Sequence, residues 1–176
     1  MVPISAAYKN AEEGCFQLAR ELVEQLEEYG FTKVKVACSS SSGALAMFIE
    51  RYFRMNAPQI SAVAVPISGD GTRTREAMEA LDKKTGNLQM IPEVLFRKGE
   101  SMRVRIEKKL QVREELMQQG LPIDVLFGAG AWEVMKTRTD FLQDRSFALV
   151  YYHCGGLGGD EYFVESFRKF LAESTT

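Results

Sequence analysis

Residues 33–67 read KVKVACSSSSGALAMFIERYFRMNAPQISAVAVPI, and they carry the clearest indication of the fold class. Its two short apolar segments, residues 33–38 and 60–67, are rich in β-branched side chains and bounded by turn-forming residues, which predicts two strands. Between them, residues 43–55 carry apolar side chains at helical spacing, and the serines at 39–42 lead the first strand into this helix. The second strand is nearly all apolar, which is typical of a strand covered on both faces of a parallel sheet.

The same alternation continues on either side of this unit. Apolar periodicity and helix-stop residues predict further helices at 11–29, 72–84, 101–119, 131–142 and 161–172, and short apolar runs predict strands at 123–127 and 147–152. Strands and helices that alternate with short connections require right-handed crossovers and a parallel sheet. We therefore predict an α/β fold, with a doubly wound, mostly parallel sheet and helices on both faces, in a single domain over residues 1–176.

Composition narrows the class of protein. The chain is 45% hydrophobic, which suits one domain with a full core. Lys and Arg number 22 against 24 for Asp and Glu, so the net charge of −2 argues against nucleic acid or a membrane surface as a partner. The N-terminus lacks the pattern of a signal peptide and no apolar run could cross a bilayer, so a cytoplasmic location is expected. Cys15, Cys38 and Cys154 are interpreted as free thiols, without a disulfide framework or a metal site.

Three predicted loops contain mainly small residues. They are CSSSSG at 38–43, GAGA at 128–131 and CGGLGG at 154–159. Ligands of open parallel sheets bind outside the carboxyl ends of the strands, where these loops are expected to lie. Small side chains let backbone N–H groups approach a ligand, and a helix start adds partial positive charge, so a phosphate is the expected ligand of the serine loop. Each loop alone also fits an ordinary tight turn, but three on one edge favour a binding site.

Two polar residues beside these loops have a structural interpretation. His153, the single histidine, follows a predicted strand and is interpreted as a hydrogen-bonded structural residue. Asp124 begins a predicted strand and is expected to cap a turn. Neither residue is assigned to catalysis.

The segments VACSSSSGALA, GLPIDVLFGAGAW and ALVYYHCGGLGG, with the start at Val2-Pro3 and the helix after it, resemble a known enzyme family in order and spacing. The family is the D-cysteine desulfhydrase and 1-aminocyclopropane-1-carboxylate (ACC) deaminase branch of the fold-type II pyridoxal-phosphate enzymes, the tryptophan-synthase-β-like superfamily. The resemblance covers nearly the whole chain, more loosely over residues 68–114. It implies that these residues are the C-terminal part of a cofactor-binding large domain. Gly130 stands where the family has a lysine, and Ile4-Ser5-Ala6 replaces its glycine-rich start.

The resemblance also implies a cofactor, pyridoxal phosphate, and the residues that bind it. The backbone N–H groups that hold the cofactor's phosphate would belong to Ser39, Ser40, Ser41, Ser42 and Gly43. The aromatic residue against the cofactor ring corresponds to Phe127, and the residue facing the pyridine nitrogen corresponds to Cys154. Three of the serines replace family glycines, and their hydroxyls add possible donors.

The family's Schiff-base lysine lies upstream of the first matched segment, together with a substrate-binding loop. Every lysine of this chain is interpreted as a solvated surface charge: Lys9, Lys33, Lys35, Lys83, Lys84, Lys98, Lys108, Lys109, Lys136 and Lys169. We therefore expect a fragment or truncated homologue of a lyase or deaminase for small amino acids, with no catalytic residue of its own and no activity alone.

Two other interpretations stay open. One is a non-catalytic binding or assembly domain on the same fold, whose exposed sheet edge contacts a partner chain. A second copy of this chain, which would form a homodimer, is one such partner. The other is an unrelated α/β domain that binds a different phosphorylated ligand.

Overall fold

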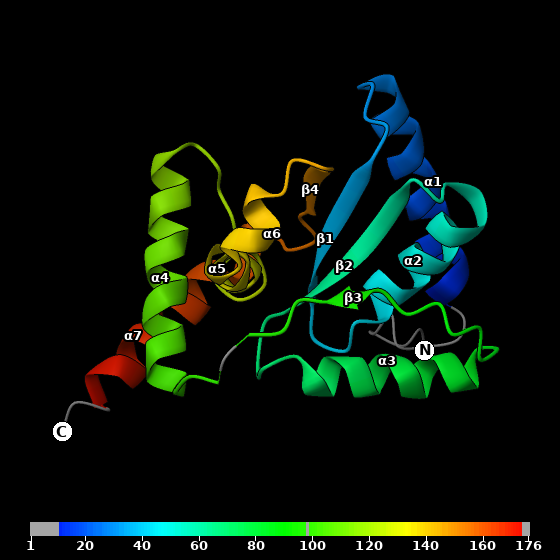
Figure 1. Cartoon of the computed structure of the whole chain (residues 1–176). Coiled ribbons are helices and arrows are strands. Elements are labelled where there is room, and N and C mark those ends of the chain that lie inside the picture. Colours follow the sequence, from blue (N-terminus) through cyan, green and yellow to red (C-terminus); the bar gives the residue numbers. More distant parts are fainter. Residues whose placement is uncertain (1–10, 98, 174–176) are drawn as a thin grey trace.

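The structure, a computed structural model, describes residues 11–97 and 99–173 (Figure 1). The resemblance over Val2-Pro3 and Ile4-Ser5-Ala6, and the interpretation of Lys9 and Lys98, lie outside these residues. The elements in chain order are α1 (Glu12–Glu28), β1 (Val34–Ser40), α2 (Ala44–Asn56), β2 (Ile60–Pro66), α3 (Thr72–Lys84), β3 (Glu93–Val94), α4 (Met102–Gln118), α5 (Gly128–Thr137), α6 (Thr139–Gln143), β4 (Ala148–Tyr152), the short 3₁₀ helix η2 (Leu157–Gly159) and α7 (Asp160–Glu173).

The four strands form one parallel sheet in the order β3-β2-β1-β4. β1 is central, and its Val34 lies opposite Ile60 of β2 and Ala148 of β4. Because each neighbouring pair is parallel, the chain crosses the sheet through helices, as the sequence pattern predicted. The predicted α/β fold class is confirmed, and most predicted helices and strands lie within two residues of the observed bounds.

Helices cover both faces of the sheet (Figure 1). One core cluster joins α1, α2 and α3 to the side chains of Val34, Val36 and Cys38. The intervening Ala37 points to the other face, where it packs with residues of α5 and α6. This alternation follows from the two-residue period of a strand. α4 packs on the outer side of α5, and α7 packs on α4.

A buried arginine joins the three helices of the first face. Arg51 of α2 is fully buried, and its guanidinium donates to the carboxylates of Glu12 on α1 and Asp82 on α3, each at 2.7 Å. It also donates to the carbonyl and hydroxyl of Thr85. Burial raises the pKa of Asp82, but the bonds from Arg51 and from the Gln89 backbone outweigh it and hold that pKa below its usual value.

The predicted secondary structure was wrong at three places. The GAGA segment at 128–131, predicted as a loop, forms the first turn of α5, because Asp124 accepts the backbone N–H groups that begin this helix. The apolar run 123–127 is not a strand, because carboxylates rather than a neighbouring strand satisfy its backbone: Val125 N–H donates to Asp160, and Phe127 N–H donates to Asp124. The single helix predicted at 131–142 is two helices, α5 and α6. They are separated at Arg138, whose backbone leaves the helical region (φ −109°, ψ 70°).

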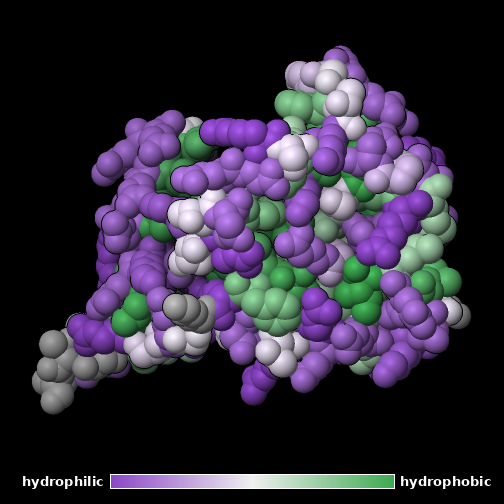
Figure 2. Space-filling view, viewed as in Figure 1, coloured by the Kyte–Doolittle hydropathy of each residue, from purple (hydrophilic) through white to green (hydrophobic). Residues whose placement is uncertain are grey.

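Polar side chains dominate the face of the molecule seen in Figure 2, with separate small hydrophobic patches between them. Among the described residues, no helix combines the length and apolarity that a bilayer crossing requires.

We predict that Arg51→Met lowers the free energy of unfolding by about 3–5 kcal/mol, because it leaves Asp82 buried without its cation. Urea denaturation measures this difference. Arg168→Met is the matched control, since the Arg168–Glu114 pair is exposed on both sides and its loss is expected to cost under about 1 kcal/mol. Equal stability of Arg51→Met and the wild type would contradict this account.

Candidate functional site

The carboxyl ends of three strands meet at one edge of the sheet, here called the carboxyl rim. β1 ends there at Ser40, which lies opposite Pro66, the last residue of β2. β4 ends there at Tyr152, which lies opposite Cys38 of β1. The segments that follow these strands therefore start at the same edge, as the sequence analysis predicted for the serine and glycine loops.

The loops after β1 and β4 approach each other at this rim. The Ser39 hydroxyl lies 3.2 Å from the Cys154 thiol, and either group can donate the hydrogen bond between them. Cys154 is exposed, whereas Ser39 is buried. Two residues separated by more than a hundred positions thus form one polar contact at the carboxyl rim.

A cavity of about 290 Å³, here called the Phe127 cavity, opens beside this contact. Phe127 and Phe163 contribute aromatic rings, each 38% exposed, and Cys154 contributes a thiol. The remaining walls are Asp124, Leu126, Gly155, Gly156, Gly159 and Asp160. The predicted ring-binding residues Phe127 and Cys154 therefore lie on the same cavity.

Asp124 fixes the wall that carries Phe127. This carboxylate is 5% exposed, accepts the Phe127 N–H at 2.6 Å and accepts the Gly128 N–H at 2.9 Å, so it caps the start of α5. The His153 imidazole lies 3.6 Å from the same carboxylate and stacks on Tyr151. The structure thus places Asp124 in the capping role expected for it. The hydrogen-bonded role expected for His153 stays a prediction, because 3.6 Å is longer than a hydrogen bond.

Asp160, at the first position of α7, fixes the wall from the other side. Its buried carboxylate accepts the Val125 N–H and a hydrogen bond from Arg113 of α4, each at 2.6 Å. This residue was not predicted from the sequence. The sequence held one signal for Asp160, because an acidic side chain follows GLGG at the start of a predicted helix. Its hydrogen bond to Val125, 35 residues earlier, could not be predicted from the sequence.

The five predicted phosphate-binding residues take three different positions. Ser39 and Ser40 belong to β1 and are buried, and the Ser40 hydroxyl donates to the Cys38 carbonyl. Ser41 and Ser42 form the turn before α2, with Ser41 exposed and Ser42 half-buried. Gly43 adopts a left-handed conformation (φ 74°) at the start of α2 and provides no side-chain cap. None of these five residues lines the Phe127 cavity itself.

Lys109 corrects the prediction that every lysine is solvated. It is 7% exposed, and its ammonium donates to the Ile67 carbonyl at 2.9 Å and faces the Leu126 carbonyl at 3.5 Å. Burial, helped by nearby Arg97, lowers the pKa of Lys109 to about 8. The spacing of the sequence could have indicated this burial, because Ile106, Lys109 and Val112 share one face of α4. The many charged residues of this helix made Lys109 look like part of a solvated face.

The Lys109 amine also lies against Gly130, where the resemblance predicted a lysine. A side-chain carbon at Gly130 would lie 3.1 Å from the Lys109 amine nitrogen and 3.4 Å from the Cβ of Ile67. The space that a larger residue would need at position 130 is therefore taken by an amine that comes from α4.

Tyr151 contributes a buried hydroxyl to the same region. Within the residues that the structure describes, this hydroxyl has no hydrogen-bond partner of normal geometry, although Ser39 lies beside it. Burial raises the pKa of Tyr151, so its hydroxyl remains protonated at neutral pH. Tyr151 lines a separate hollow with Trp132 and His153, and it does not line the Phe127 cavity.

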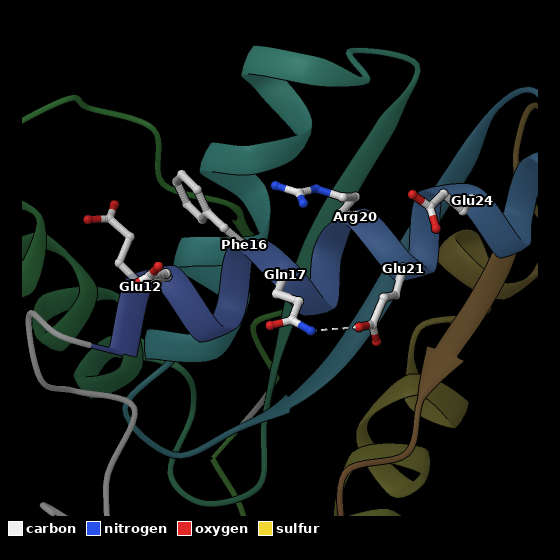
Figure 3. A pocket seen from close by; sticks show the side chains of 7 residues that line it. Glu12, Phe16, Gln17, Arg20, Glu21 and Glu24 are labelled. Carbon is white, nitrogen blue, oxygen red and sulfur yellow. Dashed lines mark hydrogen bonds between the residues drawn. The ribbon is translucent and has the colours of Figure 1, made fainter.

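A larger hollow of about 810 Å³ lies over one face of α1 (Figure 3). Its lining residues come from this single helix, and none of them was predicted as a site residue: Glu12, Glu13, Phe16, Gln17, Arg20, Glu21 and Glu24. Four carboxylates against one arginine give it a negative potential, which disfavours a phosphate.

Comparison with known proteins supports the fold. The chain is similar to a crystal structure of an ACC deaminase homologue, with a TM-score of 0.67 and 17% sequence identity. The match covers 94% of this chain and 51% of that one, so the chain spans about half the length of the structure it matches. No protein-family model matches the sequence. No curated protein matches it either. The similarity establishes the fold that the residue pattern indicated.

We predict that Gly155→Ala destabilises the protein by about 1–3 kcal/mol, because the added carbon would lie 2.2 Å from the Asp124 carboxylate. Gly156→Ala is the matched control, since a carbon there meets nothing within 4 Å and should change stability by under about 0.5 kcal/mol. Thermal and urea denaturation give both values. Equal stability of the two variants would show that Asp124 does not hold this loop.

We predict that the wild type gains stability relative to Lys109→Met as the pH rises from 8 to 10.5. The folded protein releases the Lys109 proton near pH 8, whereas the unfolded chain keeps it until about 10.5. The unfolded state binds more protons in this window, so the free energy of unfolding rises, by up to about 1.4 kcal/mol per pH unit. Urea denaturation of both proteins across the window gives the difference, and a flat difference would contradict the buried position of the amine.

Proposed function

We propose that this chain is the cofactor-binding part of a pyridoxal-phosphate-dependent lyase or deaminase for small amino acids, of the ACC deaminase or D-cysteine desulfhydrase type. The observation that carries the proposal is the meeting of Phe127 and Cys154 on one cavity at the carboxyl rim. This arrangement belongs to a sheet whose fold is similar to that of an ACC deaminase homologue.

The Phe127 cavity suits a flat heteroaromatic ring. Phe127 and Phe163 offer aromatic surfaces for stacking or edge contacts. The Cys154 thiol can form a weak hydrogen bond with a ring nitrogen, as donor or acceptor. The buried Ser39 hydroxyl orients this thiol through the hydrogen bond between them. Gly156 leaves open space at the wall, so its backbone is accessible to a ligand.

The charges around the cavity orient the ligand. Asp124 and Asp160 place two carboxylates on the cavity wall, which repel a phosphate from that end. The turn at Ser41 and Ser42 precedes the first N–H groups of α2, which carry the positive end of the helix dipole. In this proposal the ring lies toward Phe127 and the phosphate toward Ser41, Ser42 and Gly43, while Ser39 and Ser40 support them from within β1.

Pyridoxal phosphate, when bound, supplies an electron sink for bond cleavage next to an amino group. The chain's own part is to hold and orient the ring, since the buried amine of Lys109 is committed to backbone carbonyls. We infer that these residues alone bind the cofactor without turnover, and that a small amino acid reacts only when further polypeptide supplies a free amine.

A second candidate, a non-catalytic assembly domain, is favoured by one observation. Among the described strands β4 pairs only with β1, and its five apolar residues are all half-buried. Such an edge can accept another strand. Self-association in analytical ultracentrifugation, together with no affinity for a phosphorylated pyridine, would support this alternative.

We predict that Ser42→Asp abolishes binding of 4-deoxypyridoxine 5′-phosphate, a ligand that keeps the ring and phosphate but has no aldehyde to react with lysines. A carboxylate before α2 repels the phosphate, while aspartate is well tolerated near a helix start, so folding is preserved. Isothermal titration calorimetry measures the affinity.

The matched control is Thr32→Asp, which adds the same charge before β1, at the opposite end of that strand, and should bind within about twofold of the wild type. Titration with inorganic phosphate alone tests the ring contribution. Binding that survives Ser42→Asp, or phosphate binding as tight as that of the pyridine ligand, would refute the proposed cofactor-binding site.

A further inference from the structure

The buried amine of Lys109 joins two segments, one that follows β2 and one that leads into α5. Ile67 directly follows β2, and Leu126 directly precedes Phe127. The Lys109 amine contacts both carbonyls, at 2.9 Å and 3.5 Å. Leu126 itself lines the Phe127 cavity, so the amine lies one residue away from the aromatic side chain proposed to contact the ring.

Packing leaves this amine little freedom. Lys109 is 7% exposed, and the end of its side chain lies beside the first turn of α5 at Gly130, where Ile67 also packs. Its place is therefore fixed by α4 on one side and α5 on the other. A change in its hydrogen bonding must act on the carbonyls it contacts.

Charged groups from every neighbouring element act on the amine. Burial disfavours its charged form, and so do Arg97, which follows β3, and Arg105 on α4. Glu133 on α5 and Asp124 in the turn before α5 favour it. The resulting pKa of about 8 means that Lys109 is mostly charged at pH 7 and mostly neutral at pH 9.5.

We propose that Lys109 is a positioning residue whose charged amine holds the Leu126 carbonyl and thereby places Phe127, so that loss of its proton weakens binding of a phosphorylated pyridine in the Phe127 cavity. The inference rests on the proposed function, because that function supplies the ligand. Hydrogen bonds from a charged donor are roughly twice as strong as neutral ones. On deprotonation the short bond to Ile67 persists, while the longer contact to Leu126 is the first to weaken.

The test measures the affinity for 4-deoxypyridoxine 5′-phosphate at pH 7.0 and pH 9.5 by isothermal titration calorimetry. The variants are Lys109→Met, which has no charge, and Lys109→Arg, which is charged at both pH values. Lys108→Met is the matched control, because Lys108 is the adjacent lysine of α4 and pairs with Glu100 at a partly exposed site.

We expect the wild-type affinity to fall from pH 7.0 to 9.5 by at least about fivefold more than that of Lys109→Met, which is already about tenfold weaker at pH 7.0. Lys109→Arg should lose this extra pH dependence, and Lys108→Met should behave as the wild type. Equal affinity and an equal pH profile in Lys109→Met and the wild type would overturn the proposal.

A measurement without ligand separates this inference from the proposed function. In the free protein, the amide resonances of Phe127 and Gly128 should shift with a midpoint near pH 8 in the wild type and in Lys108→Met, but not in Lys109→Arg or Lys109→Met. If these resonances titrate but no variant binds the ligand, the proposed function fails and the positioning of the turn stands. If they do not titrate in the wild type, the positioning role is overturned even where Lys109→Met fails to fold.

Discussion

Parallel pairing of β1 with β2 and β4 sets the positions of the helices and of the candidate site. It directs the carboxyl ends of three strands to one rim, so that segments far apart in sequence begin within contact distance, as the Ser39–Cys154 bond shows. It also requires a crossover helix after each strand, which brings the start of α2 to the same place. A ligand at this rim therefore meets loop backbone and a helix N-terminus together, and the site follows from the topology.

The Phe127 cavity forms at the carboxyl rim because two buried carboxylates hold the backbone of residues 123–127, which has no regular secondary structure. Asp124 binds the backbone that leads into α5, and Asp160 binds the backbone at Val125 while it pairs with Arg113. Backbone groups that a strand would pair with a neighbour are satisfied here by side chains. The segment can then bend away from the sheet and present Phe127 toward the loop at Cys154.

The sequence predicted most of the fold because strand and helix periods are local properties. The unit from β1 to β2 and the helices α1, α3, α4 and α7 were predicted from apolar spacing together with turn-forming and helix-stop residues. The run 123–127 was not, because a short apolar segment reads alike in a strand and in an irregular segment packed against α4. For the site, sequence indicated the rim and Phe127 with Cys154, whereas Lys109 and Asp160 depend on carbonyls and amides that only the folded chain brings near them. The binding roles of the seven residues assigned from sequence remain predictions: Ser39, Ser40, Ser41, Ser42, Gly43, Phe127 and Cys154.

The most direct measurement of the central claim is a map of amide chemical-shift changes in the labelled chain on addition of 4-deoxypyridoxine 5′-phosphate. Two groups of amides should be perturbed, one at residues 41–46 around the serine turn and the start of α2, the other at residues 127–128 and 154–156 around the cavity. Changes confined to the acidic face of α1, or to only one of these two groups, would contradict a cofactor-binding site formed by both loops of the carboxyl rim.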